Sequence, residues 1–141
     1  MIESPRFWLT ESTLNPVEVE RRVDDPTCGA VVTFIGNVRQ TNEGREVRYL
    51  EYEAFQGMAE AKMAEIGREI EERWGLTQVA MVHRLGRCDI GEASIIIAVA
   101  SPHRKEAFEA CHYAIDRVKQ IVPIWKREVW SDGAVWIGMH A

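Results

Sequence analysis

The chain has 141 residues, of which 46% are hydrophobic and 28% are charged, and its formal net charge at pH 7 is -5. Length and composition fit one globular domain over residues 1–141 and exclude a largely disordered chain. The acidic balance argues against nucleic acid or an anionic membrane surface as the main partner, so any anion site must be a local cluster of cations.

The cysteines and the N-terminal residues bear on the cellular compartment. Cys28, Cys88 and Cys111 are odd in number and form no C-x-x-C pair, which predicts free thiols in a reducing environment. The first residues show no secretory pattern, and no apolar run approaches the roughly 18 residues that a membrane span needs. We therefore expect a cytoplasmic protein without membrane association.

The first half of the chain predicts three strands and a short helix. Residues 7–10 form a short strand, and Asn15 and Pro16 begin a helix that ends near residue 23. Residues 28–38 are almost continuously apolar and β-branched, which is typical of a central strand covered on both faces. Residues 47–54 predict a strand that pairs back on the first. Glu51 and Glu53 share one face of this strand. We expect them to form ion pairs or to face solvent rather than to act as a catalytic acid and base.

The middle of the chain predicts a helix followed by two strands. Apolar residues recur at helical spacing over residues 57–74, and Gly75 fits a left-handed C-cap. Strands at 79–85 and 93–100 are joined by a connection short enough for a hairpin. His83 in the first of them is interpreted as a packed or interface histidine rather than a catalytic one.

The last third predicts a helix and a hairpin. Ser101 and Pro102 read as the N-cap and first residue of a helix with His103 and Arg104 in its first turn. Pro123 ends this helix, and strands at 124–130 and 134–138 follow. The apolar arc of the helix comprises Ala107, Phe108, Cys111, Ala114, Ile115, Val118 and Val122.

Together these elements predict an α+β fold in which hairpins outnumber crossover units, with a largely antiparallel or mixed sheet. The chain contains no G-x-G-x-x-G, P-loop, H-E-x-x-H or C-x-x-C motif, and its four histidines lack ligand-like spacing. Nucleotide-cofactor and metal sites are therefore disfavoured.

Five basic residues occupy positions suited to anion binding. Arg39 lies at a strand end, His103 and Arg104 at a helix start, and the lysines at 119 and 126 on either side of Pro123. A helix N-terminus attracts anions, and arginine offers two parallel hydrogen bonds to phosphate. Arg104 and Lys119 are about 22 Å apart along one helix at about 1.5 Å per residue. If both are functional, a two-fold dimer would bring them together.

Lys119 and Lys126 allow two interpretations. A lysine near a second cation and apolar walls has a lowered pKa and can act as a nucleophile or general base. Alternatively, Lys119 extends over an apolar surface and Lys126 pairs with Glu128 on the same strand face.

A resemblance bears on that choice. Residues 29–39 (GAVVTFIGNVR), 50–54 (LEYEA), 83–86 (HRLG), 91–94 (GEAS), 101–104 (SPHR) and 119–128 (KQIVPIWKRE) occur in family order. With them, the chain resembles the large, catalytic subunit of molybdopterin synthase over most of residues 5–138. The resemblance implies an α/β hammerhead-type domain with a mixed or antiparallel sheet and an added antiparallel β subdomain.

The activity implied by the resemblance is sulfur insertion. Two sulfurs from a small ubiquitin-like carrier, whose Gly-Gly end bears a thiocarboxylate, enter cyclic pyranopterin monophosphate and form the dithiolene of molybdopterin. The catalytic subunit forms a homodimer with one carrier at each end, giving a heterotetramer. No further cofactor is implied, because the carrier supplies the sulfur.

The resemblance also implies residue roles. Lys119 is similar to the central catalytic lysine and Lys126 to its neighbour, while Arg39 matches an active-site arginine. Phe34 matches an aromatic residue of the pocket, and His103 and Arg104 match phosphate contacts from the second subunit. The alternative function is a non-catalytic docking module for a ubiquitin-like Gly-Gly tail or a phosphorylated ligand, using the same basic groove.

Overall fold

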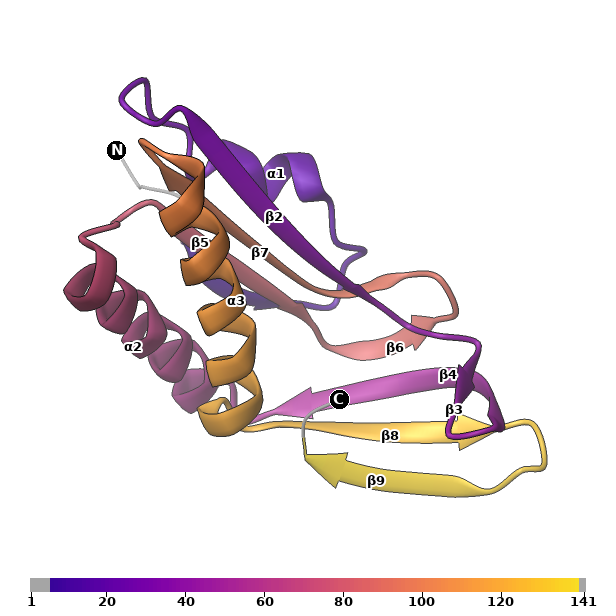
Figure 1. Cartoon of the computed structure of the whole chain (residues 1–141). Coiled ribbons are helices and arrows are strands. Elements are labelled where there is room, and N and C mark those ends of the chain that lie inside the picture. The colour runs from indigo at the N-terminus through magenta and orange to yellow at the C-terminus, as the bar shows by residue number, and fades with distance from the viewer. Residues whose placement is uncertain (1–5, 140–141) are drawn as a thin grey trace.

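The computed structural model describes residues 6–139 and contains two sheets (Figure 1). The first sheet has the strand order β1-β5-β7-β2. β1 runs parallel to β5, and the other pairs are antiparallel, so this sheet is mixed. Its strands are β1 (Phe7–Thr10), β2 (Ala30–Asn37), β5 (Val79–Arg84) and β7 (Ala93–Ser101).

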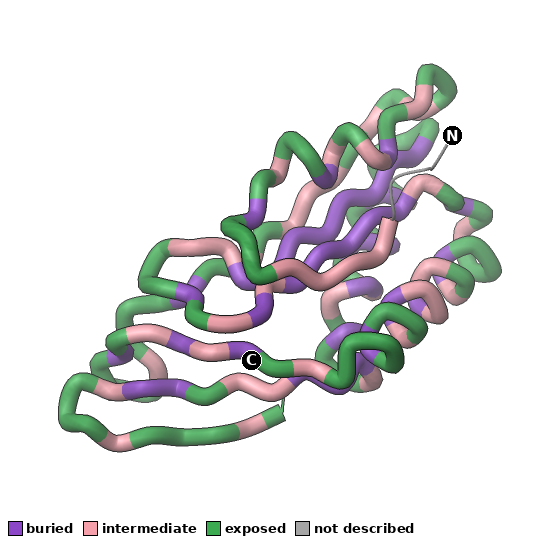
Figure 2. Tube along the Cα trace, turned by 180° about the vertical axis from the view of Figure 1, so that it is seen from behind, coloured by how far each residue is buried: buried purple, intermediate pink, exposed green. Residues whose placement is uncertain are grey.

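Helices cover both faces of the first sheet. α2 (Gln56–Trp74) and α3 (Arg104–Ile121) pack on one face, and the short α1 (Pro16–Arg21) lies on the other. Alternate residues of β5 enter different cores, since Met81 packs with α2 and α3 while Val82 packs with α1. This two-sided burial explains why β5 and β7 are mostly apolar. Figure 2 shows that these inner strands are buried along almost their whole length.

The second sheet is antiparallel and lies beside the first. In it β4 (Arg45–Ala54) pairs with β8 (Ile124–Trp130) on one side and with β3 (Thr41–Asn42) and β6 (Gly86–Asp89) on the other. β9 (Val135–Met139) forms the edge next to β8. The predicted α+β class, with a mixed sheet and an added antiparallel β subdomain, is confirmed.

Two predicted strand placements are wrong. β2 lies at the edge of the first sheet with β7 as its neighbour, and Val31 and Ile35 on it are 48% and 40% exposed. β4 joins the second sheet instead of pairing back on an earlier strand of the first. An apolar, β-branched run identifies a strand, but the choice of its neighbours depends on contacts with distant segments.

The start of α3 also differs from the prediction. His103 is the N-cap and Arg104 the first helical residue, while Ser101 ends β7. The Ser101 hydroxyl nevertheless accepts a hydrogen bond from the His103 backbone N–H at 3.4 Å. Phe108, which is predicted to lie on the apolar arc, is 59% exposed because it falls at the border of the buried face. The left-handed cap at Gly75 is confirmed, with φ of 70°.

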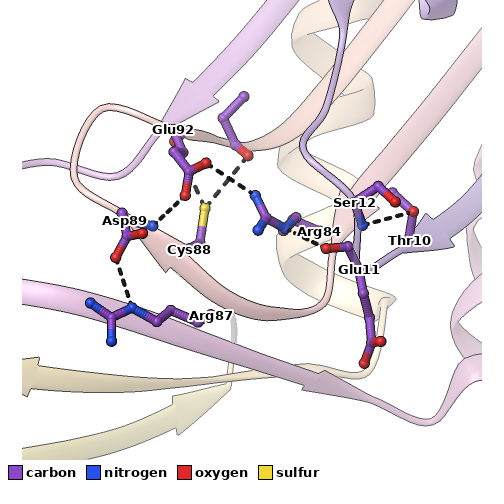
Figure 3. A network of polar contacts seen from close by, with 9 residues as sticks. Thr10, Glu11, Ser12, Arg84, Arg87, Cys88, Asp89 and Glu92 are labelled. Atoms are coloured by element: carbon purple, nitrogen blue, oxygen red, sulfur yellow. Dashed lines mark hydrogen bonds and ion pairs between the residues drawn. The ribbon is translucent and has the colours of Figure 1, made fainter.

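A polar network fixes the segment that joins the two sheets (Figure 3). The Arg84 guanidinium donates to the Glu11 carbonyl at 3.1 Å and lies 3.5 Å from the Glu92 carboxylate. Glu92 accepts the Asp89 backbone N–H at 2.8 Å, and the Cys88 thiol lies near the Glu92 carbonyl. These contacts hold β6 in place while it pairs with β4, so they position one sheet against the other.

A second polar cluster ties α2 to α3. Glu69 accepts two hydrogen bonds from Arg117, each at 2.8 Å, and one from the Tyr113 hydroxyl at 2.6 Å. The hydrogen bonds from Arg117 lower the pKa of Glu69 from 4.5 to about 2. A carboxyl with a lowered folded-state pKa stabilises the fold above its unfolded pKa, and this stabilisation is lost as the pH falls towards 2.

We therefore expect Glu69→Gln to lower the free energy of unfolding by about 1–3 kcal/mol near pH 7. The difference from wild type should shrink as the pH falls below about 4.5, where the unfolded wild-type carboxyl becomes protonated. Urea unfolding at a series of pH values measures both effects. Glu72→Gln, at an exposed position of the same helix, is the matched control. A pH-independent difference would contradict the ion-pair explanation.

Candidate active site

A cavity of about 350 Å³ opens where the two sheets meet the C-terminal end of α3. Four of the six predicted site residues line it: Phe34, Arg39, Lys119 and Lys126. They come from β2, the segment after β2, the last turn of α3, and β8. Arg39 and the two lysines thus converge on one cavity, to which Phe34 contributes an aromatic wall. The roles assigned to these residues stay predictions.

The chain reversal at Pro123 brings the two lysines to one cavity. α3 ends at Ile121, Val122 is its extended C-cap, and β8 begins at Ile124. Lys119 is exposed on the final helical turn, whereas the Lys126 side chain is only 12% exposed. The two ammonium groups therefore have different surroundings, one solvated and one enclosed.

Glu128 is the negative group of the cavity. It is 1% exposed, and its carboxylate lies 3.3 Å from Lys126 Nζ. It also accepts hydrogen bonds from Trp130 Nε1 at 2.7 Å and from Asn42 Nδ2 at 3.2 Å. Burial alone would raise the pKa of Glu128, but these donors and the Lys126 charge lower it below its ordinary value. The carboxylate is therefore ionised, and the predicted pairing of Lys126 with Glu128 is confirmed.

Further polar side chains line the inner wall of the cavity. Tyr52 is 3% exposed, and burial raises its pKa to about 12, so the hydroxyl stays protonated at neutral pH. The His83 ring contacts Tyr52 edge-on with centroids 4.8 Å apart, and its Nδ1 lies 2.8 Å from the Arg84 carbonyl oxygen. His83 is buried, as predicted, and it also lines the cavity together with Ser94.

His103 and Arg104 lie at the opposite end of α3 from Lys119. They line a separate surface hollow, together with Gly29, Ala30, Pro102 and Lys105. The length of the helix keeps this hollow about 22 Å from Lys119 at about 1.5 Å per residue. One chain alone therefore does not bring all six predicted residues together.

Sequence reasoning missed Asn42 and Tyr52 as groups of the cavity, and it identified Glu128 only as an ion-pair partner of Lys126. Glu128 carried a usable signal, because it lies two residues after Lys126 on the same strand face. Asn42 carried none, since it is 86 residues from Glu128 and reaches it only through the pairing of β4 with β3 and β8. Among residues 6–139, no group of three or more His, Cys, Asp or Glu side chains could hold a metal ion.

Comparison with known proteins shows the family of this chain. The model of the MoaE protein family matches residues 9–121. The chain belongs to the MoaE protein family. A relative in the family, the molybdopterin synthase catalytic subunit of Bacillus subtilis, is 51% identical over 133 residues, covering 94% of this chain and 85% of that protein.

Solved structures agree with the MoaE assignment. Molybdopterin synthase from Staphylococcus aureus superposes with a TM-score of 0.92 at 42% identity, covering 98% of this chain and 100% of that one. A complex of subunits 1 and 2 of molybdopterin-converting factor from Helicobacter pylori gives a TM-score of 0.76 at 20% identity, covering 91% and 87%. This second likeness shows the fold alone. In the described part of the MoaE chain, no helix is long and apolar enough to cross a membrane.

Proposed function

We propose that this chain is the catalytic subunit of a molybdopterin synthase, an enzyme of molybdenum cofactor biosynthesis. As a sulfurtransferase it would insert two sulfurs from a thiocarboxylated ubiquitin-like carrier into cyclic pyranopterin monophosphate. The observation that carries the proposal is the convergence of Arg39, Lys119 and Lys126 on one cavity. This convergence occurs in a chain that is 51% identical to a molybdopterin synthase catalytic subunit.

The cavity suits acyl and sulfur transfer because it places cations where negative charge develops. Attack on a thiocarboxylate or opening of a cyclic phosphate creates an oxyanion, which fixed cations stabilise strongly in an enclosed site. We assign this role to Arg39 and Lys126. Lys119, on the solvated side, acts on the incoming carrier end as a nucleophile or general base.

Two of the chain's three cysteines are poor sulfur donors. Cys88 and Cys111 are buried, and burial raises the pKa of each thiol to about 11, so neither forms a reactive thiolate at neutral pH. This supports delivery of sulfur by the carrier. We propose no further cofactor. A Gly-Gly tail can enter this cavity because glycine has no side chain that would clash with the cavity walls. The free thiols also fit a cytoplasmic location.

The assembly we propose is a homodimer of this chain with one carrier at each end. The hollow around His103 and Arg104 lies at the first turn of α3, where backbone N–H groups and two basic side chains favour a phosphate. A two-fold axis can place this hollow of one subunit beside the Lys119 cavity of the other. The substrate phosphate would then be held by the second subunit.

The test is reconstitution from purified components. The chain is mixed with thiocarboxylated carrier and cyclic pyranopterin monophosphate, and dithiolene formation is followed together with loss of the thiocarboxylate. We expect two carriers to be consumed for each dithiolene formed. Binding of the carrier without any chemical conversion would instead support the docking-module alternative.

A further inference from the structure

An exposed aromatic side chain, Trp136, lies at the rim of the cavity. In the antiparallel β8–β9 pair, Glu128 is opposite Trp136 and Lys126 is opposite Gly138. Directly opposed residues lie on the same face of a sheet. Trp136 and Gly138 therefore share the face on which Lys126 and Glu128 line the cavity. The Lys126 ammonium is 5.4 Å from the Trp136 ring centroid.

The Trp136 ring can adopt its orientation only because residue 138 is a glycine, which has no side chain. A Cβ added at Gly138 would overlap carbons of the six-membered ring of Trp136. The indole therefore lies across Gly138 along its own strand. A ring already held in place loses little conformational entropy when a ligand packs on it, which favours binding.

The other two tryptophans of the second sheet, Trp125 and Trp130, have their rings packed against other side chains. Trp125 lies on the opposite face of β8 and packs edge-on against Phe55 at a centroid distance of 5.4 Å. Trp130 donates to Glu128, and its ring is covered by the Arg45 guanidinium at 3.7 Å. Trp136 instead remains 43% exposed beside the cavity. Its free ring area is available to a ligand that enters there.

We propose that Trp136 is a substrate-binding residue whose indole stacks on the planar pyrimidinone ring of a pterin. This inference rests on the function proposed above, because it assumes a pterin phosphate in the cavity. The chemistry of the neighbours fits such a ligand. The indole offers a flat apolar surface, Lys126 offers a cation for an oxyanion or phosphate, and Glu128 keeps that cation in place.

A second role for the ring is to shield the Lys126 ammonium by a cation–π contact. The two roles differ in their consequences. Stacking affects ligands that contain a pterin ring, whereas shielding affects every anion that Lys126 binds. Inorganic phosphate, which has no ring, therefore separates them when Arg104→Ala is present in every protein compared, because this substitution disables the phosphate hollow at the start of α3.

The experiment measures equilibrium binding of cyclic pyranopterin monophosphate and of inorganic phosphate to the full-length protein. We expect Trp136→Ala to weaken pterin binding about tenfold and Trp136→Phe to retain most of the affinity. Gly138→Ala should also weaken pterin binding, since its Cβ displaces the ring. Phosphate binding should not change in any of these variants. Ile137→Ala, 66% exposed on the opposite face of β9, is the matched control and should bind both ligands as wild type does.

Three results would overturn the inference. Unchanged pterin binding by Trp136→Ala would exclude stacking while leaving the proposed function intact. Equal weakening of pterin and phosphate would show that the ring acts through Lys126. Failure of the wild-type protein to bind the pterin phosphate at all would reject the proposed function and the inference together.

Discussion

Lys119→Ala is expected to slow dithiolene formation by about 10²–10⁴-fold, because a positioned nucleophile or proton-transfer group is removed from the cavity. Stability should be nearly unaffected. Lys119 is exposed on the last turn of α3, and alanine is a good helix former, so the free energy of unfolding should change by less than about 0.5 kcal/mol. Single-turnover assays with excess thiocarboxylated carrier, together with urea unfolding, measure the two quantities.

Two further variants make this result specific. His112→Ala, at an exposed position in the middle of the same helix, should keep the wild-type rate. Lys126→Ala should lose activity and also about 1–3 kcal/mol of stability, because it removes a partner of the buried Glu128 carboxylate. A wild-type rate for Lys119→Ala would refute the catalytic role of this lysine, whatever the result for Lys126.

Mixing inactive Arg104→Ala and inactive Lys119→Ala chains is expected to restore activity. The two residues lie at opposite ends of α3, so an active site that uses both must draw them from different subunits. Each site takes Lys119 from one subunit and Arg104 from the other. A mixed dimer therefore has one site that carries both substitutions and one site that carries neither. With free exchange of subunits, roughly half of the dimers are mixed, and about a quarter of the wild-type activity returns.

The matched control is a mixture of Lys119→Ala with Lys126→Ala chains. Both lysines line the same cavity of one chain, so every subunit in this mixture carries a damaged cavity and no activity should return. Sedimentation of the wild-type protein should show a dimer. Equal recovery in the two mixtures, or a monomer at assay concentration, would count against the shared site.

Local patterns were sufficient for much of the molecule. Helical spacing of Ala59, Met63, Ile66 and Ile70 correctly predicted the buried face of α2, and Pro123 marked the change from helix to strand. The rise of an α-helix, about 1.5 Å per residue, is enough to place Arg104 and Lys119 at opposite ends of α3. Such features depend on residues close in sequence, whose geometry is set by the backbone itself.

By itself, the sequence determined where the helices and most strands lie, the family, and the pair of lysines on either side of Pro123. Only the tertiary structure decided that β2 is an edge strand and that β4 leaves the first sheet for the second. It also decided that Asn42 and Trp130 hold Glu128 beside Lys126, and that Trp136 lies at the cavity rim. The physical reason is that periodicity reports which face of an element is buried. Many strand orders bury the same faces, and the choice among them is made by contacts between segments far apart in the chain.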